Sequence, residues 1–287
     1  MRYNKRRQAF RAILGGAACV HPGSVFDPLS ARIAEDIGFE CGMFAGSVAA
    51  LTVLGAPDIV VLTLSEFAQQ IARITRAGEL PLLVDADHGY GNALSVMRTV
   101  EELEIAGVAA MTIEDTALPT PFGTSKPSLL PRDEGLGKIR AALAARRDPG
   151  LAIVGRTSAL AIAGLNETLV RAKAYAAAGA DALFFTGVTD TEKLRAIRAA
   201  TDKPLILGGT DGELGGKLGM AALGVRVALQ GHQPFMAAVQ AVQATLRALR
   251  DGVAPHALTG QPGVALLKTL TRDADYAAAA RDFLAAP

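Results

Sequence analysis

The feature that most constrains the fold is a repeating unit of about 30 residues, in which a short apolar run precedes a helix-like segment. Eight apolar runs of strand length occur, at residues 17–20, 41–47, 81–87, 109–115, 151–157, 180–187, 203–209 and 225–231. The segments between them, such as 64–79, 93–107 and 166–180, carry apolar side chains at three- and four-residue spacing. This alternation predicts a parallel sheet covered by helices.

The positions of the glycines support the same repeating strand–helix unit. Four expected helices end on a glycine just before the next apolar run, at Gly38, Gly107, Gly179 and Gly224. Glycine adopts the left-handed conformation that ends a helix at little energetic cost. Eight such units in about 240 residues favour a closed (β/α)8 barrel, a TIM barrel, over an open doubly wound sheet.

The rest of the chain fits around this barrel. We expect the barrel at about residues 15–250, a helix at 3–14, and an alanine-rich helical tail at about 255–287. No segment has the composition of a linker, so one domain over residues 1–287 is predicted. A hydrophobic content of 50% is enough for a core of that size.

Charge and hydropathy narrow the possible partners. The chain has 29 basic and 28 acidic residues, so its net charge of +1 favours neither nucleic acid nor an anionic membrane. No apolar run approaches the ~18 residues of a membrane span, and Gly15 and Gly16 interrupt the N-terminal stretch that follows the first basic residues. We therefore expect a cytoplasmic protein that binds a small molecule.

Polar side chains gather at the carboxyl ends of the expected strands. Catalytic groups of βα barrels lie there, because the loops form a cleft while the strand interiors are packed. The residues at these ends are Gly46, Ser47, Asp85, Asp87, Glu114, Asp115, Arg156, Thr157, Thr186, Gly208, Gly209 and His232. We expect them to converge on one mouth of the barrel.

The segment VDADHGYGN, residues 84–92, gives the clearest chemical signal. Side chains alternate along a strand, so Asp85 and Asp87 are expected on one face, where two carboxylates repel unless they are protonated or share a cation. Mg²⁺ suits such a pair, because it takes one or two protein carboxylates and retains water. Glu114 is a candidate third acid. The alternative is that the aspartates cap the following helix or turn.

Three further residues each have a functional and a structural interpretation. Arg156 would bind a substrate carboxylate through paired hydrogen bonds, or form a structural salt bridge at the rim. Ser47 would bind an anionic oxygen, or act as a helix N-cap. His232 would face a ligand, or simply begin a helix before Pro234.

Together these motifs resemble the isocitrate lyase and phosphoenolpyruvate mutase superfamily of Mg²⁺-dependent barrels, which act on small 2-oxo acids. The resemblance rests on FAGSVAA, VDADHGYGN, AGVAAMTIED and GRTSA, and extends from SVFDPLSARIAEDIGFECG to GHQPF. Within the superfamily the chain is most similar to the bacterial oxaloacetate decarboxylase family, which has a histidine after the eighth strand.

The resemblance implies a metal site and an assembly. Asp85 would bind Mg²⁺ directly, and Asp87 and Glu114 would hold its water ligands, with Mn²⁺ able to substitute. Asp58 matches another recurring acid at the mouth. The superfamily also implies a homotetramer, a dimer of dimers with exchanged terminal helices.

The resemblance also implies how substrate is held. Ser47, beside Gly46, would contact the substrate carboxylate and Arg156 would pair with it, while His232 would face the departing end. Asp85, Arg156 and His232 are thus the expected catalytic residues. The implied reaction is Mg²⁺-dependent decarboxylation of oxaloacetate to pyruvate and CO₂, in which the metal stabilises an enolpyruvate.

Two departures from the superfamily's sequence pattern argue against other reactions of the superfamily. The region LPTPFGTSKPSLLP, within the 117–131 loop, has neither the cysteine nor the histidine of the lyase branch, and of the phosphonate branch's loop it offers only Lys126. The alternatives are a carbon–carbon lyase or a hydroxymethyltransferase acting on a related 2-oxo or 2-hydroxy acid. A barrel that binds a dicarboxylate without turnover is an alternative of a different class.

Overall fold

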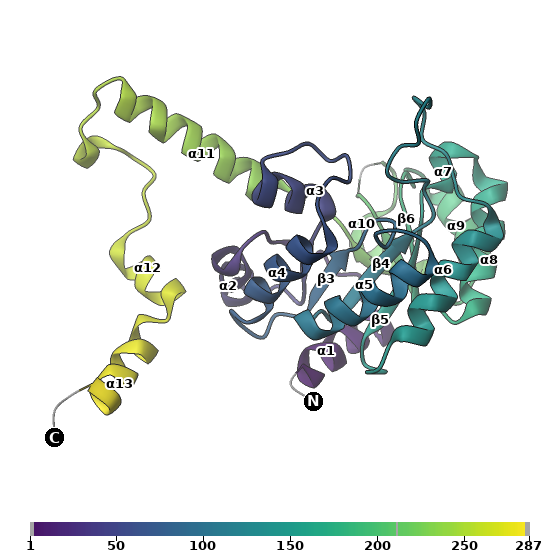
Figure 1. Cartoon of the computed structure of the whole chain (residues 1–287), viewed down its shortest axis with the longest axis horizontal. Coiled ribbons are helices and arrows are strands. Elements are labelled where there is room, and N and C mark those ends of the chain that lie inside the picture. The colour runs from purple at the N-terminus through teal and green to yellow at the C-terminus, as the bar shows by residue number, and fades with distance from the viewer. Residues whose placement is uncertain (1–2, 211, 285–287) are drawn as a thin grey trace. The chain divides into compact units, whose positions relative to one another are not determined.

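The computed structural model describes residues 3–210 and 212–284. The chain forms two compact units, Met1–His232 and Gln233–Pro287. The first is an α/β barrel and the second is helical (Figure 1). One domain over residues 1–287 stays a prediction.

Eight parallel strands form one curled sheet in which each strand pairs with the next along the chain. They are β1 (Gly23–Ser24), β2 (Gly42–Phe44), β3 (Leu82–Asp85), β4 (Ala110–Glu114), β5 (Ala152–Thr157), β6 (Ala182–Phe185), β7 (Leu205–Leu207) and β8 (Val225–Ala228). Val20 joins the ends of the sheet, because its N–H donates to the Arg226 carbonyl at 2.9 Å and its carbonyl accepts from the Ala228 N–H at 3.0 Å. The predicted barrel is confirmed.

The first strand lies later than predicted. A strand over residues 17–20 is wrong, because β1 is Gly23–Ser24 and Val20 alone in the fully described segment 17–20 pairs with the sheet. Pro22, between Val20 and β1, has no N–H to donate, so it cannot extend the pairing that Val20 makes with β8.

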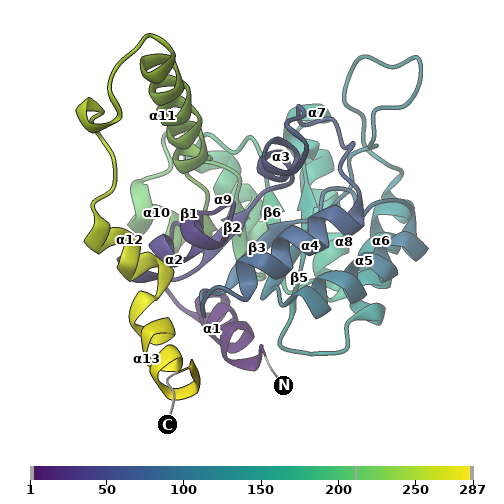
Figure 2. The ribbon, with the colours of Figure 1, turned by 60° about the vertical axis from the view of Figure 1, so that its left-hand side comes forward.

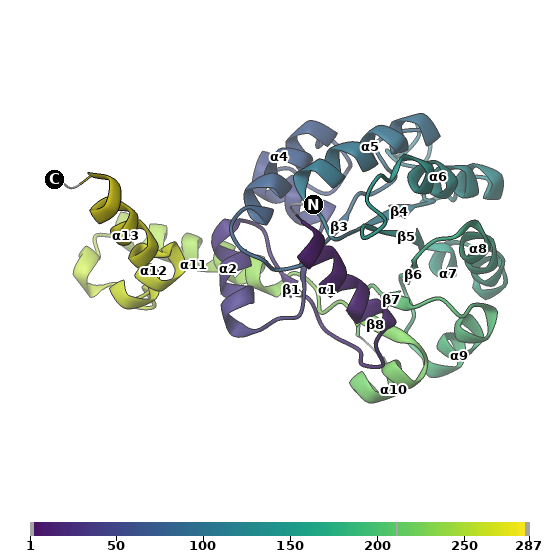
Figure 3. The ribbon, with the colours of Figure 1, turned by 90° about the horizontal axis from the view of Figure 1, so that it is seen from below.

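Helices surround the sheet, as Figure 3 shows. They are α2 (Pro28–Ile37), α4 (Leu64–Thr75), α5 (Ala93–Ala106), α6 (Arg132–Ala145), α8 (Leu165–Ala178), α9 (Thr191–Ala200) and α10 (Gly216–Ala222). Each long helix buries one apolar stripe, as α4 does with Phe67, Ile71 and Ile74. The expected leading helix is α1 (Asn4–Gly15), which lies across the amino ends of the strands (Figure 3).

Short helices follow two strands at the opposite, carboxyl end. α3 (Gly46–Ala49) comes directly after β2 and continues as the π-helix η1 (Ala50–Leu54), and α7 (Ala159–Ile162) comes after β5. They occupy the loops that border the barrel mouth.

The second unit is helical, as the sequence predicts for the tail. It contains α11 (Gln233–Arg250), the 3₁₀ turn η2 (Pro255–Ala257), α12 (Val264–Thr271) and α13 (Asp273–Leu284) (Figure 2). Within residues 3–210 and 212–284, no helix combines the length and apolar character that crossing a membrane requires.

The four predicted helix-ending glycines all adopt left-handed backbone, with φ of 97° at Gly38, 92° at Gly107, 102° at Gly179 and 82° at Gly224. The conformation, rather than a lack of space, is what requires glycine at Gly179. An added Cβ there would meet nothing closer than Leu143 Cδ1 at 3.6 Å.

Gly179→Ala should therefore reduce the free energy of unfolding by about 1–2 kcal/mol, because an L side chain is disfavoured in left-handed backbone. The matched control is Gly137→Ala in the interior of α6, where an added Cβ also meets no atom within 4 Å. That variant should be stabilised by about 0.5–1 kcal/mol, since alanine is the better helix former. Urea denaturation measures both, and equal effects of the two variants would contradict this account.

Candidate active site

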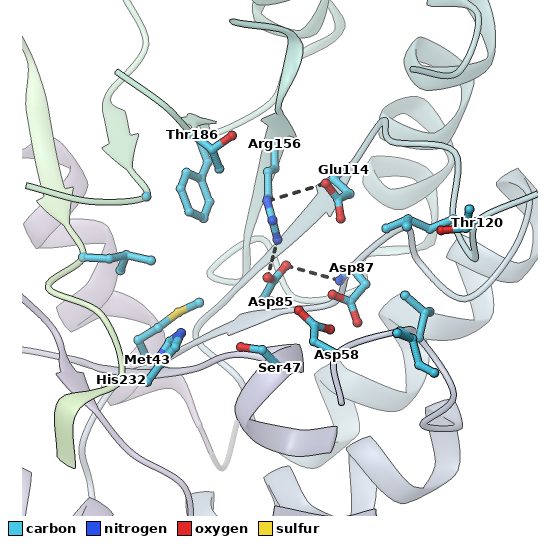
Figure 4. A pocket seen from close by; sticks show the side chains of 16 residues that line it. Met43, Ser47, Asp58, Asp85, Asp87, Glu114, Thr120, Arg156, Thr186 and His232 are labelled. Carbon is cyan, nitrogen blue, oxygen red and sulfur yellow. Dashed lines mark hydrogen bonds and ion pairs between the residues drawn. The ribbon is translucent and has the colours of Figure 1, made fainter. Parts of the chain in front are cut away.

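A pocket of about 270 Å³ opens at the carboxyl ends of the strands (Figure 4). Most of the residues expected at the barrel mouth lie around it. The lining residues are Met43, Ser47, Asp58, Ile59, Val60, Asp85, Asp87, Glu114, Leu118, Thr120, Arg156, Phe184, Thr186, Gly208, Leu229 and His232. Segments far apart in sequence thus meet at one site.

Asp85 lies in the middle of this pocket, at the end of β3 (Figure 4). Its Oδ1 accepts a hydrogen bond of 2.7 Å from Thr112 Oγ1, and its Oδ2 pairs with the Arg156 guanidinium. The Asp87 N–H approaches Oδ1 at 3.3 Å. The side chain is therefore held in one orientation, with only 8% of the residue exposed.

Asp87 reaches the pocket through a turn rather than through strand alternation. β3 ends at Asp85, and Asp87 has a left-handed φ of 47°, which is rare outside glycine. Gly46 makes room for it, since an added Cβ there would lie 2.6 Å from Asp87 Oδ2. Burial and the carboxylates of Asp85 and Glu114 raise the pKa of Asp87 well above its ordinary value.

Glu114 and Arg156 are register partners on β4 and β5. Thr116 Oγ1 donates to Glu114 Oε2 at 2.8 Å, and Arg156 Nε lies 3.8 Å from the same oxygen. Burial, with a contribution from Asp85, raises the pKa of Glu114. The Arg156 guanidinium also lies over the Phe184 ring at 5.4 Å, which fixes its plane.

The structure excludes the N-cap interpretation of Ser47, and excludes the capping alternative for the two aspartates as far as the following helix is concerned. The N-cap of α5 is Asn92, so neither Asp85 nor Asp87 caps that helix, although Asp85 does accept the local bond from the Asp87 N–H. The N-cap of α3 is Ala45, so the N-cap interpretation of Ser47 is wrong. Ser47 lies in the first turn of α3 and lines the pocket.

His232 borders the pocket opposite Glu114, and Asp58 lies close to Asp87 (Figure 4). His232 Nδ1 lies 3.0 Å from Ser24 Oγ, and burial lowers the pKa of this histidine despite the nearby carboxylates of Asp85 and Asp58. Burial and Asp85 raise the pKa of Asp58.

Some strand-end residues point elsewhere. Asp115 points away from the pocket. Its Oδ2 accepts hydrogen bonds from Tyr175 OH at 2.6 Å and from Arg171 at 2.9 Å. Thr157 Oγ1 accepts from the Ala159 N–H at 3.2 Å, at the start of α7. These contacts connect the strands to the helical layer.

Sequence reasoning missed several lining or supporting residues. Thr112, the register partner of Asp85, and Phe184, the register partner of Arg156, were detectable from strand alignment alone. Leu118 and Thr120 come from the 117–131 loop, whose path no periodicity describes. Ser24 lies on the strand whose position was wrongly predicted.

The side chains suit a divalent cation. Four carboxylates face this pocket and only one guanidinium balances them, which leaves an excess of negative charge among hard oxygen donors. Within the described part of the chain, no three or more His, Cys, Asp or Glu side chains form a ready cage for a metal. The set fits an ion that takes one or two carboxylates directly and the others through water.

A parallel βα barrel with acids and one arginine at its carboxyl mouth has the arrangement of the active site of a βα-barrel enzyme. The phosphoenolpyruvate phosphomutase family matches residues 10–250, and the chain belongs to this family.

Known proteins of this kind cover nearly the whole chain. An "Oxaloacetate decarboxylase" of Rhodopseudomonas palustris (strain ATCC BAA-98 / CGA009) is 57% identical over 272 residues, which are 95% of this chain and 94% of that protein. A structure of phosphonopyruvate hydrolase in complex with oxalate and Mg²⁺ has a TM-score of 0.85 at 30% identity, and covers 98% of this chain and 99% of its own. A structure of oxaloacetate acetylhydrolase in complex with the inhibitor 3,3-difluorooxalacetate has a TM-score of 0.84 at 29% identity, and the match covers 96% of each chain.

Proposed function

We propose that this protein catalyses the Mg²⁺-dependent decarboxylation of oxaloacetate to pyruvate and CO₂. One observation carries the proposal: three buried or half-buried acids, Arg156 and His232 converge on one pocket in a chain 57% identical to a relative with this activity in its name. The acids are Asp85, Asp87 and Glu114.

The metal would be held by the acids at the ends of β3 and β4. Asp85 would bind it directly, Asp87 and Glu114 would hold its water ligands, and Mn²⁺ would be able to replace Mg²⁺. When bound, the ion acts as a Lewis acid toward the negative charge that develops on the substrate's keto oxygen. Thr112 and Thr116 orient Asp85 and Glu114 through hydrogen bonds of 2.7 and 2.8 Å.

The other residues fix the substrate's orientation. Arg156 pairs with the carboxylate next to the keto carbon, because a guanidinium matches a carboxylate with two hydrogen bonds. Ser47 and Gly46 at the start of α3 bind the same end, and His232 faces the carboxylate that departs. The bond to the departing carboxylate then breaks and CO₂ leaves. The electron pair of that bond is delocalised toward the keto oxygen as an enolate, until the carbon that becomes the methyl group of pyruvate gains one proton from solvent or a nearby group.

The loop after β4 favours decarboxylation over carbon–carbon lysis. The residues that the described structure brings from residues 117–131 to the pocket wall are Leu118 and Thr120. Neither has a side chain acidic enough to protonate a carbanionic leaving group, as lysis of a longer acid requires. Loss of CO₂ itself needs no acid, and the small enolate that remains can take its proton from solvent.

The purified protein should release pyruvate from oxaloacetate in Mg²⁺, should lose this activity in excess chelator, and should recover it when Mg²⁺ or Mn²⁺ returns. Spontaneous decarboxylation under the same metal concentration is the control, and methylated malates, citrate analogues and ketopantoate test the lyase and transferase alternatives. If the protein turned over one of these compounds faster than oxaloacetate, that reaction would replace the proposed one. Binding of oxalate with no turnover of any would favour a non-catalytic barrel.

The oligomeric state stays a prediction from the family resemblance, and the location stays a prediction from the sequence composition. We expect a homotetramer, a dimer of dimers, in the cytoplasm, with a small 2-oxo dicarboxylate as the partner.

A further inference from the structure

Ser24 lies beside the proposed site but outside its lining. It is the last residue of β1, and its Oγ is 3.0 Å from Nδ1 of His232, which follows β8. The two residues face each other across the seam that Val20 closes between the first and last strands. His232 lines the pocket, and Ser24 contacts its Nδ1. Nε2 is therefore the ring nitrogen that can contact a substrate.

We propose that Ser24 is a positioning residue that donates its hydroxyl hydrogen to Nδ1 of His232, and so holds the neutral ring in the tautomer with Nε2–H available to the pocket. The partner of one ring nitrogen determines which nitrogen carries the proton. A serine hydroxyl can donate as well as accept, and a neutral Nδ1 that accepts from it leaves the hydrogen on Nε2. The effect on catalysis rests on the proposed function.

A neutral donor suits the departing end of the substrate. The carboxylate that leaves as CO₂ loses its negative charge in the transition state, so a cation bound to it would stabilise the substrate more than the transition state. A neutral N–H can orient that carboxylate while stabilising the bound substrate, relative to the transition state, less than a cation would. Burial lowers the pKa of His232, against the opposing effect of the Asp85 and Asp58 carboxylates, which agrees with a neutral ring.

The tautomer is measured by NMR of protein labelled with ¹⁵N in its histidine rings, with His232→Gln to assign the resonance. Wild type should show an unprotonated Nδ1 and a protonated Nε2 at a pH where the ring is neutral. Ser24→Ala should give a mixture of tautomers, and its KM for oxaloacetate should rise about threefold to tenfold, more than kcat changes. Ser24→Thr keeps the hydroxyl and should resemble wild type.

The matched control is His21→Ala. His21 Nδ1 lies 2.7 Å from the Ala228 carbonyl at the same seam. If a looser seam were the cause, this variant would reproduce the rise in KM, and the proposal would be overturned. It would also be overturned by a protonated Nδ1 in neutral wild type, or by an unchanged tautomer in Ser24→Ala. The NMR result needs no turnover, so it decides the proposal even if oxaloacetate is not the substrate.

Discussion

Asp85→Ala is expected to reduce Mg²⁺-dependent decarboxylation by about three orders of magnitude, because a bound metal contributes several kcal/mol of charge stabilisation and each 1.36 kcal/mol is tenfold in rate. The variant should also lose the thermal stabilisation that Mg²⁺ gives wild type, since an ion that binds only the folded state raises stability. Initial rates of pyruvate formation and melting curves with and without Mg²⁺ measure both effects.

The substitution also removes the partner of Arg156, so a fall in activity has to be separated from a loss of folding. Asp85→Asn keeps the side chain's size and an acceptor for Thr112 while it removes the charge. Asp148→Asn is the matched control, because Asp148 is a buried acid paired with Arg7 at 2.5 Å, just before β5 at the amino end of the barrel. It should lower stability and leave the Mg²⁺ response intact. A Mg²⁺-dependent rate within tenfold of wild type in folded Asp85→Ala would contradict the metal assignment.

The barrel was predictable because one physical pattern repeats along the chain. Buried parallel strands require nearly continuous apolar runs, and each return helix requires an apolar stripe and a stop, which Gly38, Gly107 and Gly179 supply. The bounds of single elements were less predictable. The first strand is Gly23–Ser24 rather than residues 17–20, and α4 ends at Thr75, several residues before the expected 79.

The expectation that functional side chains lie at the carboxyl ends of strands correctly placed Asp85 and Asp87 at the pocket. It explains the position of Asp85 but not that of Asp87. Asp85 does end a strand, but Asp87 reaches the same pocket through left-handed backbone that sequence alternation does not describe. The same expectation placed Asp115 at the mouth, whereas the structure pairs it with Arg171 and Tyr175 in the helical layer. Glu114 and Asp115 are adjacent, so they point to opposite sides of the sheet.

The contacts that orient the site are the part that sequence could not supply. Ser24 and His232 are separated by 208 positions, and Arg156 and Asp85 by 71. The first pair meets because the sheet closes between its first and last strands, and the second because β3 and β5 flank β4. No local sequence pattern records which side chains then lie within hydrogen-bond distance. The residue types predict the chemistry of the site, while the pairing and closure of the strands determine its geometry.

Arg156→Lys is expected to lower kcat/KM for oxaloacetate by about 10²–10³-fold, the usual effect of removing one preorganised donor from a developing or bound anion. Lysine keeps the positive charge but not the planar fork that binds a carboxylate with two hydrogen bonds. In the structure the guanidinium contacts Asp85 and Glu114, and its buried Nε has no hydrogen-bond partner within the described residues. This Nε lies 3.8 Å from Glu114 Oε2, and lysine has no equivalent of it.

The metal response distinguishes this variant from Asp85→Ala. Arg156→Ala removes a cation from among the pocket's carboxylates, so Mg²⁺ binding without substrate should be retained or tightened, while turnover falls and added guanidinium partly restores it. Arg146→Lys is the control, since Arg146 pairs with Asp181 at 2.6 Å at the amino end of the barrel. Its kcat/KM should stay within about threefold of wild type, because this pair lies at the opposite end of the barrel from the pocket. Loss of Mg²⁺ binding in Arg156→Ala would mean that the arginine supports the metal site rather than the substrate.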